Sequence, residues 1–152
     1  MIVVADSSPL ITLAQSQHFD LLHDFYVEVI ISREVHYEVC VAGAALGGAL
    51  EVQRATWIRV QPTPPVSSPE VQAVGAGLGL GERSIIYLAL TLGADLVLID
   101  DRRARSAAKT VGSKSPVRSP FSNGAHGSVE LMTCGPYTSA SWNRAYAMTA
   151  GC

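Results

Sequence analysis

The sequence predicts an α/β domain with a mainly parallel sheet. Short apolar runs rich in β-branched residues alternate with longer segments of helical period, in the order β-α-β-α-β-α-β-α. The hydrophobic share of 48% and the charged share of 16% over 152 residues are typical of a chain that buries a core and is not disordered. No apolar run reaches the roughly 18 residues that a membrane helix needs.

The first strand is expected in residues 1–5, MIVVA, an apolar β-branched run typical of a buried strand. Ser8 is expected to cap the next helix, with Pro9 at its first position. This helix is predicted to run toward His18, and a second amphipathic segment occupies residues 18–26.

Residues 27–32, VEVIIS, are interpreted as the second strand. Ser32 can cap a helix over residues 33–46, whose apolar side chains recur on one face from Val35 onward. Glycines are expected to loosen the chain after this helix. The third strand is predicted in residues 57–63, where prolines end it.

The second half of the sequence predicts a helix at 67–74, a loop at 75–81, a helix at 82–93, a strand at 94–99 and a helix at 100–112. The loop GAGLGLG lacks the G-x-G-x-x-G spacing, and no lysine follows it. It is therefore interpreted as a turn before a helix, not as a phosphate-binding loop.

Acidic side chains stand where the predicted strands end or helices begin. Asp6 follows the first strand, Asp100 and Asp101 follow the last one, Glu82 begins a helix and Glu38 lies within one. Ligands of parallel sheets bind beyond the carboxyl ends of the strands, so the topology can gather these groups at one edge. Gathered carboxylates repel one another unless a cation lies between them, and oxygen ligands favour Mg²⁺ or Mn²⁺ over zinc.

Each acid also has a structural interpretation. Asp6 can act as a helix cap, Glu38 as a solvated helix acid, and Glu82 as a complement to a helix N-terminus. One of the two adjacent aspartates is expected to be a cap, and Glu34 is more typical of a solvated acid.

The arginines and the residues after Asp6 leave further alternatives. Arg102, Arg103 and Arg105 either hold phosphates or pair with the adjacent aspartates. A receiver-type phosphotransfer domain that uses Mg²⁺ would need an acidic pair after the first strand. A haloacid-dehalogenase-like phosphatase would need an acid at the position of Ser8.

Together these motifs resemble the PIN domain, in the branch of short prokaryotic proteins related to VapC toxins. VVADSSPLITLA resembles the opening signature, and V-x-x-E-V from Val35 to Val39 resembles the second acidic motif. LGERSIIYLAL resembles the third motif and ADLVLIDDRRAR the fourth. The resemblance covers roughly residues 1–112.

The resemblance implies a PIN-like three-layer α/β/α fold and a metal-dependent ribonuclease. It assigns the catalytic residues as Asp6, Glu38, Glu82 and Asp101, with the same four and Asp100 as ligands of Mg²⁺ or Mn²⁺. The implied mechanism activates a water for in-line attack on an RNA phosphodiester, and a second ion steadies the leaving oxygen.

The resemblance also implies partners: an RNA substrate such as tRNA or mRNA, an antitoxin that blocks the site, and a second copy in a homodimer. A cytoplasmic location is expected, because the first residues do not resemble a signal peptide and Cys40, Cys134 and Cys152 have no metal-like spacing. The alternative is a degenerate PIN fold that binds RNA or a partner protein without catalysis.

Residues 113–152 depart from the family pattern. This segment has no Ile, no Asp and one Leu, where another apolar strand and a helix are expected. We interpret residues 1–112 as the PIN-like domain and 113–152 as an atypical, irregular tail. A frameshift or an unrelated C-terminal replacement would explain it. The same reading frame in independent clones, with no family-like ending in another frame, would contradict the frameshift.

Overall fold

The computed structural model describes residues 1–45 and 47–114 of the chain. Strands and helices alternate along them, and the four strands lie in a single sheet. The elements are β1 (Val3–Ala5), α1 (Ser7–Gln15), α2 (Leu21–Phe25), β2 (Val29–Ser32), α3 (Arg33–Tyr37), the π-helix η1 (Glu38–Ala42), α4 (Ala49–Arg54), β3 (Ile58–Gln61), α5 (Pro69–Gly75), α6 (Leu80–Leu92), β4 (Leu96–Leu98) and α7 (Arg102–Lys114).

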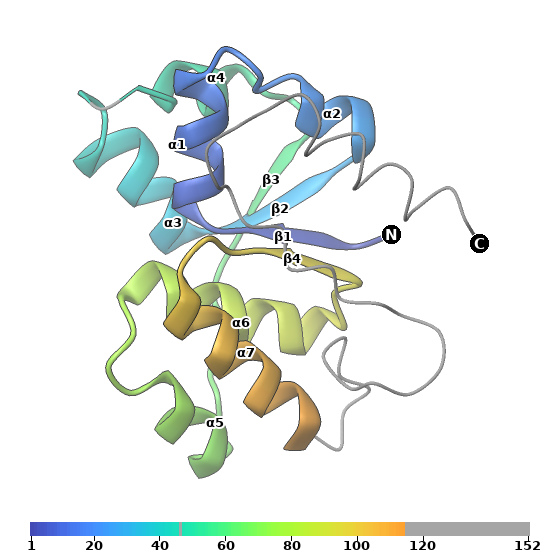
Figure 1. The fold of residues 1–152 in the computed structure, drawn as a ribbon, viewed down its shortest axis with the longest axis vertical. Coiled ribbons are helices and arrows are strands. Elements are labelled where there is room, and N and C mark those ends of the chain that lie inside the picture. Colours follow the sequence, from blue (N-terminus) through green and yellow to red (C-terminus); the bar gives the residue numbers. More distant parts are fainter. Residues whose placement is uncertain (46, 115–152) are drawn as a thin grey trace.

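The sheet has the strand order β3-β2-β1-β4, and all of its strand pairs are parallel. Helices α1, α2 and α4 lie on one side of the sheet, and α5, α6 and α7 lie on the other (Figure 1). This arrangement confirms the predicted three-layer α/β/α fold. Because β1 lies between β2 and β4, the residue after β1 occupies the middle of the carboxyl edge of the sheet.

The core lies on both faces of this sheet. All residues of β1, β2 and β4 are buried, as expected for parallel strands covered by helices on both sides. From α1, Leu10 and Leu13 pack into the core, and from α6 it receives Ile85, Ile86 and Leu88. These apolar residues of the two helices therefore face the core, and the exposed side chains of the helices face away from it.

The start of α1 corrects one sequence expectation. The helix begins at Ser7, so its N-cap is Asp6 and not Ser8. The Asp6 side chain makes no capping hydrogen bond, although its backbone has the extended conformation of a cap. Within α1 its carboxylate accepts hydrogen bonds from Ser7, the first helical residue, and not from the N–H groups that a capping side chain usually engages.

The helix predicted over residues 33–46 is interrupted. It passes from α3 into the π-helix η1, where the N–H of Gly43 donates to the carbonyl oxygen of Glu38 at 2.7 Å. A Cβ at Gly43 would lie 2.6 Å from that oxygen, so glycine permits this closure. The short helix α4 then forms in a region where only a loosened chain was expected.

The end of the described chain bears on the predicted domain boundary. Helix α7 continues through Gly112 to Lys114, so the boundary proposed after residue 112 falls inside it. The division into domain and tail stays a prediction, and residues 115–152, with the frameshift hypothesis, lie outside the described ones. Among the described helices, none has the length and apolar character to cross a membrane.

Candidate functional site

Asp6 is the most deeply buried carboxylate at the carboxyl edge of the sheet. Its side chain is 2% exposed, and its oxygen Oδ1 has no hydrogen-bond partner in the described part of the chain. The backbone N–H of Asp6 donates to the carbonyl of Leu98 at 2.9 Å, which ties it to the end of β4. A buried carboxylate oxygen without a partner is costly, so this atom calls for a cation or a proton.

The pKa of Asp6 shows which groups surround it. Burial is the largest cause that raises this pKa from 3.8 to about 6. Hydrogen bonds from Ser7 lower it in part, while the negative charges of Glu38 and Glu82 raise it further. The fold therefore brings Asp6, Glu38 and Glu82 into one electrostatic neighbourhood, although the three lie far apart in the sequence.

Glu38 reaches this neighbourhood from the first residue of η1. Its Oε1 accepts a hydrogen bond from the N–H of Gly81 at 3.2 Å. A Cβ at Gly81 would lie 2.5 Å from Oε2 of Glu38, closer than real Cβ atoms approach. The absence of a side chain at Gly81 thus makes the space that the Glu38 carboxylate occupies.

Glu82 belongs to the first turn of α6. Its Oε2 accepts a hydrogen bond from the N–H of Gly79, the N-cap of this helix, at 2.8 Å. This bond is one half of a capping box, and a carboxylate there also complements the helix dipole. Both roles considered for Glu82 from the sequence therefore apply. It stabilises the start of α6, and it lies near Asp6.

Two buried serines connect the elements that carry these acids. Ser32, the N-cap of α3, accepts from the N–H of Val35 at 3.0 Å, which confirms its predicted role. The hydroxyls of Ser32 and Ser84 lie 2.6 Å apart, and Ser84 donates to the carbonyl of Gly81 at 2.6 Å. The hydroxyl proton of Ser84 is donated to the carbonyl oxygen of Gly81, so the donor in the bond between the two serines must be Ser32. This chain of bonds fixes the start of α3 to the first turn of α6.

The adjacent aspartates have a different role in the structure. Oδ1 of Asp101 accepts from the N–H groups of Arg103 at 2.7 Å and Ala104 at 2.8 Å, so Asp101 caps α7. This confirms that one of the pair is a cap. Asp101 is exposed and Asp100 is half-buried. The charges that raise the pKa of Asp6 come from Glu38 and Glu82, not from this pair.

The arginines that follow do not pair with these aspartates. Arg103 donates from its guanidinium to the carbonyl of Gly77 at 3.2 Å, which holds the loop before α6. Across residues 1–45 and 47–114, the ion pair that forms is Arg59 with Glu28, at 2.9 Å and far from the site. The alternative that the arginines hold phosphates stays a prediction.

The donor set fits a divalent cation, although the side chains do not converge on one point. Within the described ranges, no three His, Cys, Asp or Glu side chains stand close enough to coordinate one ion. Glu38 and Glu82 are turned toward backbone N–H groups instead. The unpartnered oxygen of Asp6 and the acidic neighbours supply the hard oxygen ligands that Mg²⁺ and Mn²⁺ prefer.

Sequence reasoning missed Gly81 and Ser84, and it misjudged Glu34. The carboxylate of Glu34 is half-buried and accepts from the hydroxyl of Thr63 at 2.6 Å, so it is not a solvated acid. Gly81 had one signal, its position directly before an acid of the constellation. Ser84 had none, since a single serine within an apolar helix shows no partner in the sequence.

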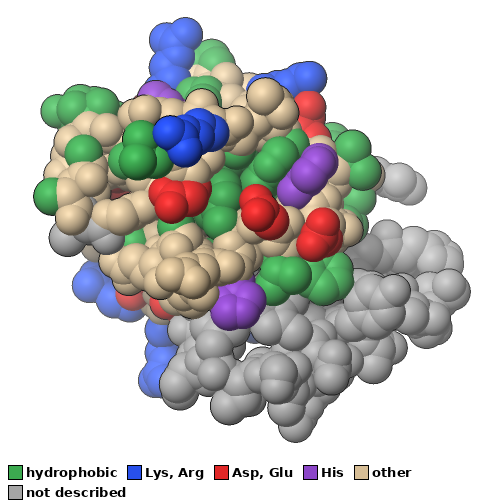
Figure 2. Space-filling view, turned by 90° about the horizontal axis from the view of Figure 1, so that it is seen from above, with side chains coloured by type: hydrophobic (Ala, Val, Ile, Leu, Met, Phe, Trp, Pro, Cys, Tyr) green, Lys and Arg blue, Asp and Glu red, His purple; other side chains and the backbone are tan. Residues whose placement is uncertain are grey.

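The surface seen from above, over the end of the molecule that carries α1, α2 and α4, is mixed in charge. Figure 2 shows acidic side chains as separate spots, with basic side chains and exposed hydrophobic ones between and around them. The described residues on this face form no broad basic patch of the kind that binds nucleic acid by charge alone.

The comparisons with known proteins point to one family. The family model DUF3368, a PIN domain, matches residues 2–115, which is more than half of the chain. No curated protein and no solved structure gives a significant match. The matched stretch includes Asp6, Glu38, Glu82 and both adjacent aspartates.

Proposed function

The chain belongs to the PIN domain family, and on this basis we propose that it is a metal-dependent endoribonuclease. PIN domains are generally nucleases that use divalent metal ions, so nuclease chemistry follows from the family itself. The proposal adds RNA as the substrate, Mg²⁺ or Mn²⁺ as the ion, and the toxin of a toxin–antitoxin pair as the biological role.

The single observation that supports the proposal best is the state of Asp6. A buried carboxylate with an unpartnered oxygen and a pKa raised to about 6 lowers the stability of the fold. Carboxylates in this state are typical of functional sites. A cation beside Asp6 would remove both the burial cost of its charge and its repulsion with Glu38 and Glu82.

The residues of the chain divide the work in this proposal. Asp6, at the centre of the sheet edge, would hold the ion together with Glu38 from η1 and Glu82 from α6. Asp101, with Asp100 assisting, is proposed as a further ligand through its oxygen Oδ2, since Oδ1 caps α7. When bound, the divalent ion supplies positive charge that acidifies a water and offsets the charge of the phosphodiester.

Cleavage of RNA with and without a chelator tests this function. A fluorescent single-stranded RNA is incubated with the protein in Mg²⁺ or Mn²⁺, in EDTA, and with the Asp6→Asn variant. We expect cleavage with the ions, none in EDTA, and a loss of at least about 10²-fold in the variant. Activity that survives both EDTA and Asp6→Asn would refute the proposed mechanism.

The second candidate function is binding of RNA or a protein without catalysis. It is favoured by the hydrogen bonds of Glu38 and Glu82 to backbone N–H groups, which give one oxygen of each carboxylate a partner without an ion. Calorimetric titration with Mn²⁺ separates the two candidates. A nuclease site takes up Mn²⁺ with heat that disappears in Asp6→Asn, whereas a binding scaffold shows no such difference.

The proposed partners are an antitoxin and a second copy of the chain. Exposed apolar side chains near Glu38 support an interface there: Tyr37 is 60% exposed and Val41 57% exposed. Light scattering on the purified protein should give twice the mass of the chain if the homodimer forms. Tyr37→Asp should then return the protein to the monomer.

A further inference from the structure

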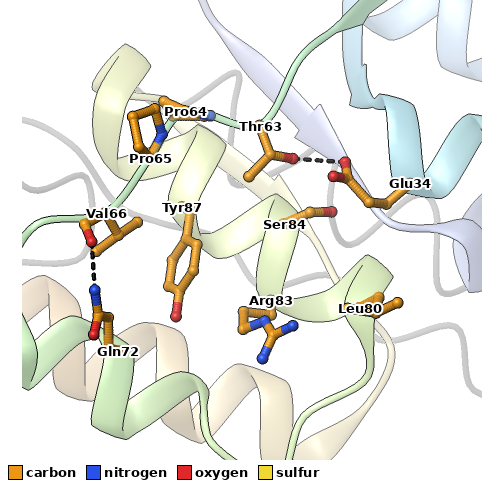
Figure 3. A pocket seen from close by; sticks show the side chains of 10 residues that line it. All are labelled: Glu34, Thr63, Pro64, Pro65, Val66, Gln72, Leu80, Arg83, Ser84 and Tyr87. Carbon is orange, nitrogen blue, oxygen red and sulfur yellow. Dashed lines mark hydrogen bonds between the residues drawn. The ribbon is translucent and has the colours of Figure 1, made fainter.

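A concave site borders α6, the helix that also carries Glu82. It is a pocket of about 500 Å³ between α6, α5 and the connection from β3 to α5 (Figure 3). The lining residues are Glu34, Thr63, Pro64, Pro65, Val66, Gln72, Leu80, Arg83, Ser84 and Tyr87. Asp6, Glu38 and Glu82 do not line it, and its volume is in the range of pockets for small ligands.

Arg83 brings an unneutralised positive charge to this pocket. Its guanidinium makes no hydrogen bond or ion pair with the residues that the structure describes. The acid that lines the same pocket, Glu34, accepts from the hydroxyl of Thr63 and forms no ion pair with Arg83. A guanidinium without a partner at a pocket wall offers two parallel N–H donors to an anion such as a phosphate.

The position of Arg83 is set by packing. Its stem lies against Gly75 at the end of α5, where an added Cβ would come within 3.0 Å of Cδ. The same Cβ would lie 2.5 Å from the hydroxyl of Tyr87, one turn further along α6. Arg83 and Tyr87 therefore share one face of α6, and Figure 3 shows both beside the open space of the pocket.

We propose that this pocket binds one nucleotide of a single-stranded RNA, with a phosphate on Arg83 and the base against the ring of Tyr87. The proposal rests on the proposed ribonuclease function and names a substrate subsite for it. An aromatic ring beside a cation recognises base and phosphate together, as single-stranded nucleic acids require. Pro64, Pro65 and Val66 add apolar surface to the lining.

The location also fits a substrate that continues into the carboxylate site. Glu34 precedes Glu38 by four residues, and Leu80 and Arg83 bracket Gly81 and Glu82. Four residues of helix span about 6 Å, so the pocket and the site are near neighbours along both elements. The second oxygen of Glu34 accepts no bond within the described chain, so it can accept one from a ribose 2′-hydroxyl.

The test measures RNA binding in a protein that cannot cleave. All variants carry Asp6→Asn, and fluorescence anisotropy follows the binding of a labelled single-stranded RNA at several salt concentrations without added metal. Arg83→Met keeps the apolar stem against Gly75 and removes the charge. Arg54→Met on α4, across the sheet from the pocket, is the matched control.

We expect Arg83→Met to weaken binding by about tenfold or more, since a hydrogen bond to a charged group is lost. The slope of the logarithm of affinity against the logarithm of salt should fall by about 0.7, because one phosphate contact on a single strand disappears. Arg54→Met should change neither quantity. Tyr87→Phe should retain affinity, and Tyr87→Leu should lose it.

The outcomes separate this proposal from the ribonuclease function. Unchanged RNA affinity in Arg83→Met overturns the subsite even if the wild-type protein cleaves RNA. Affinity that depends on Arg83 supports it even if no cleavage is found. The same titration with a labelled oligoglutamate peptide tests a protein partner. Peptide binding that depends on Arg83, together with RNA binding that does not, would overturn the nucleotide assignment.

Discussion

Asp6 and Gly81 show how single residues shape the site. Asp6 supplies a buried charge without a full set of partners, and Gly81 supplies the absence of a side chain. The N–H of Gly81 also fixes one oxygen of Glu38. The position of the Glu38 carboxylate therefore depends on a residue that has no reactive group of its own.

The substitution Gly81→Ala tests this dependence. Its Cβ would lie 2.5 Å from Oε2 and 2.7 Å from Oε1 of Glu38, so the carboxylate must move. A displacement of about 1 Å at a reacting group costs on the order of 10²-fold in rate. We therefore expect RNA cleavage to fall by about that factor, measured as kcat/KM.

Gly79→Ala is the matched control for this experiment. A Cβ at Gly79 meets Oε2 of Glu82 at 3.5 Å, an ordinary contact, and the N–H that Glu82 accepts is retained. Alanine at position 81 favours helix formation by up to about 1 kcal/mol, so α6 itself is not weakened. Equal cleavage by Gly81→Ala and Gly79→Ala would contradict the positioning role of Gly81.

At the scale of elements, α3 and α6 are held together by the pair of serines. The hydroxyls of Ser32 and Ser84 are buried, so removing one leaves a polar group in the core without its partner. Such a loss costs about 1–3 kcal/mol. We expect Ser84→Ala to lower the free energy of unfolding by this amount in urea denaturation.

Thr91→Ala on the same helix is the control for Ser84→Ala. The hydroxyl of Thr91 is exposed and donates to a carbonyl within α6, so its loss should change stability by no more than about 0.5 kcal/mol. If both variants unfold alike, the bond between Ser32 and Ser84 does not connect the two elements in solution.

The elements differ in how far the sequence could predict them. The parallel strands and the long helix α6 were predicted because their apolar residues are numerous and regularly spaced. The helix α4 was missed because six residues after a pair of glycines carry too little periodicity. The start of α6 at Leu80 was missed because glycine is a weak cap signal, although Glu82 at the third helical position indicates a capping box.

The site was predicted only in part, because its hydrogen bonds join residues that lie far apart in the sequence. The acids could be placed at one edge because topology determines where strands end. The hydrogen bonds of Glu38 to Gly81 and of Glu34 to Thr63 join segments 43 and 29 residues apart, and no local pattern encodes them. The cap function of Asp101 was foreseen for one member of the pair, because acids commonly begin helices.

At the scale of the whole molecule, burial of Asp6 makes stability depend on pH. The folded state holds the Asp6 proton more tightly than the unfolded state, whose carboxyl has its ordinary pKa of 3.8. Stability in a chelator should therefore fall as pH rises from about 4 through 6. The charged carboxylate costs the fold up to about 3 kcal/mol at pH 7.

Asp6→Asn removes this cost. In EDTA, we expect the variant to be more stable than the wild type at pH 7 by up to about 3 kcal/mol in urea denaturation. The difference should shrink toward pH 4, where Asp6 is protonated in the folded wild type. A variant that is less stable than the wild type at pH 7, or a difference that does not change with pH, would contradict the raised pKa.

We propose that Asp6 holds a divalent ion that RNA cleavage requires, and a change of ligand chemistry at this position tests the proposal. Asp6→Cys replaces a hard oxygen ligand by a thiolate, which prefers soft ions such as Cd²⁺. Cleavage is measured for Asp6→Cys and for Asp6→Ser, in Mg²⁺ alone and after addition of Cd²⁺. We expect Asp6→Cys to be inactive in Mg²⁺ and to regain activity with Cd²⁺, while Asp6→Ser regains none. Full activity of Asp6→Cys in Mg²⁺ alone, or equal rescue of both variants by Cd²⁺, would contradict it.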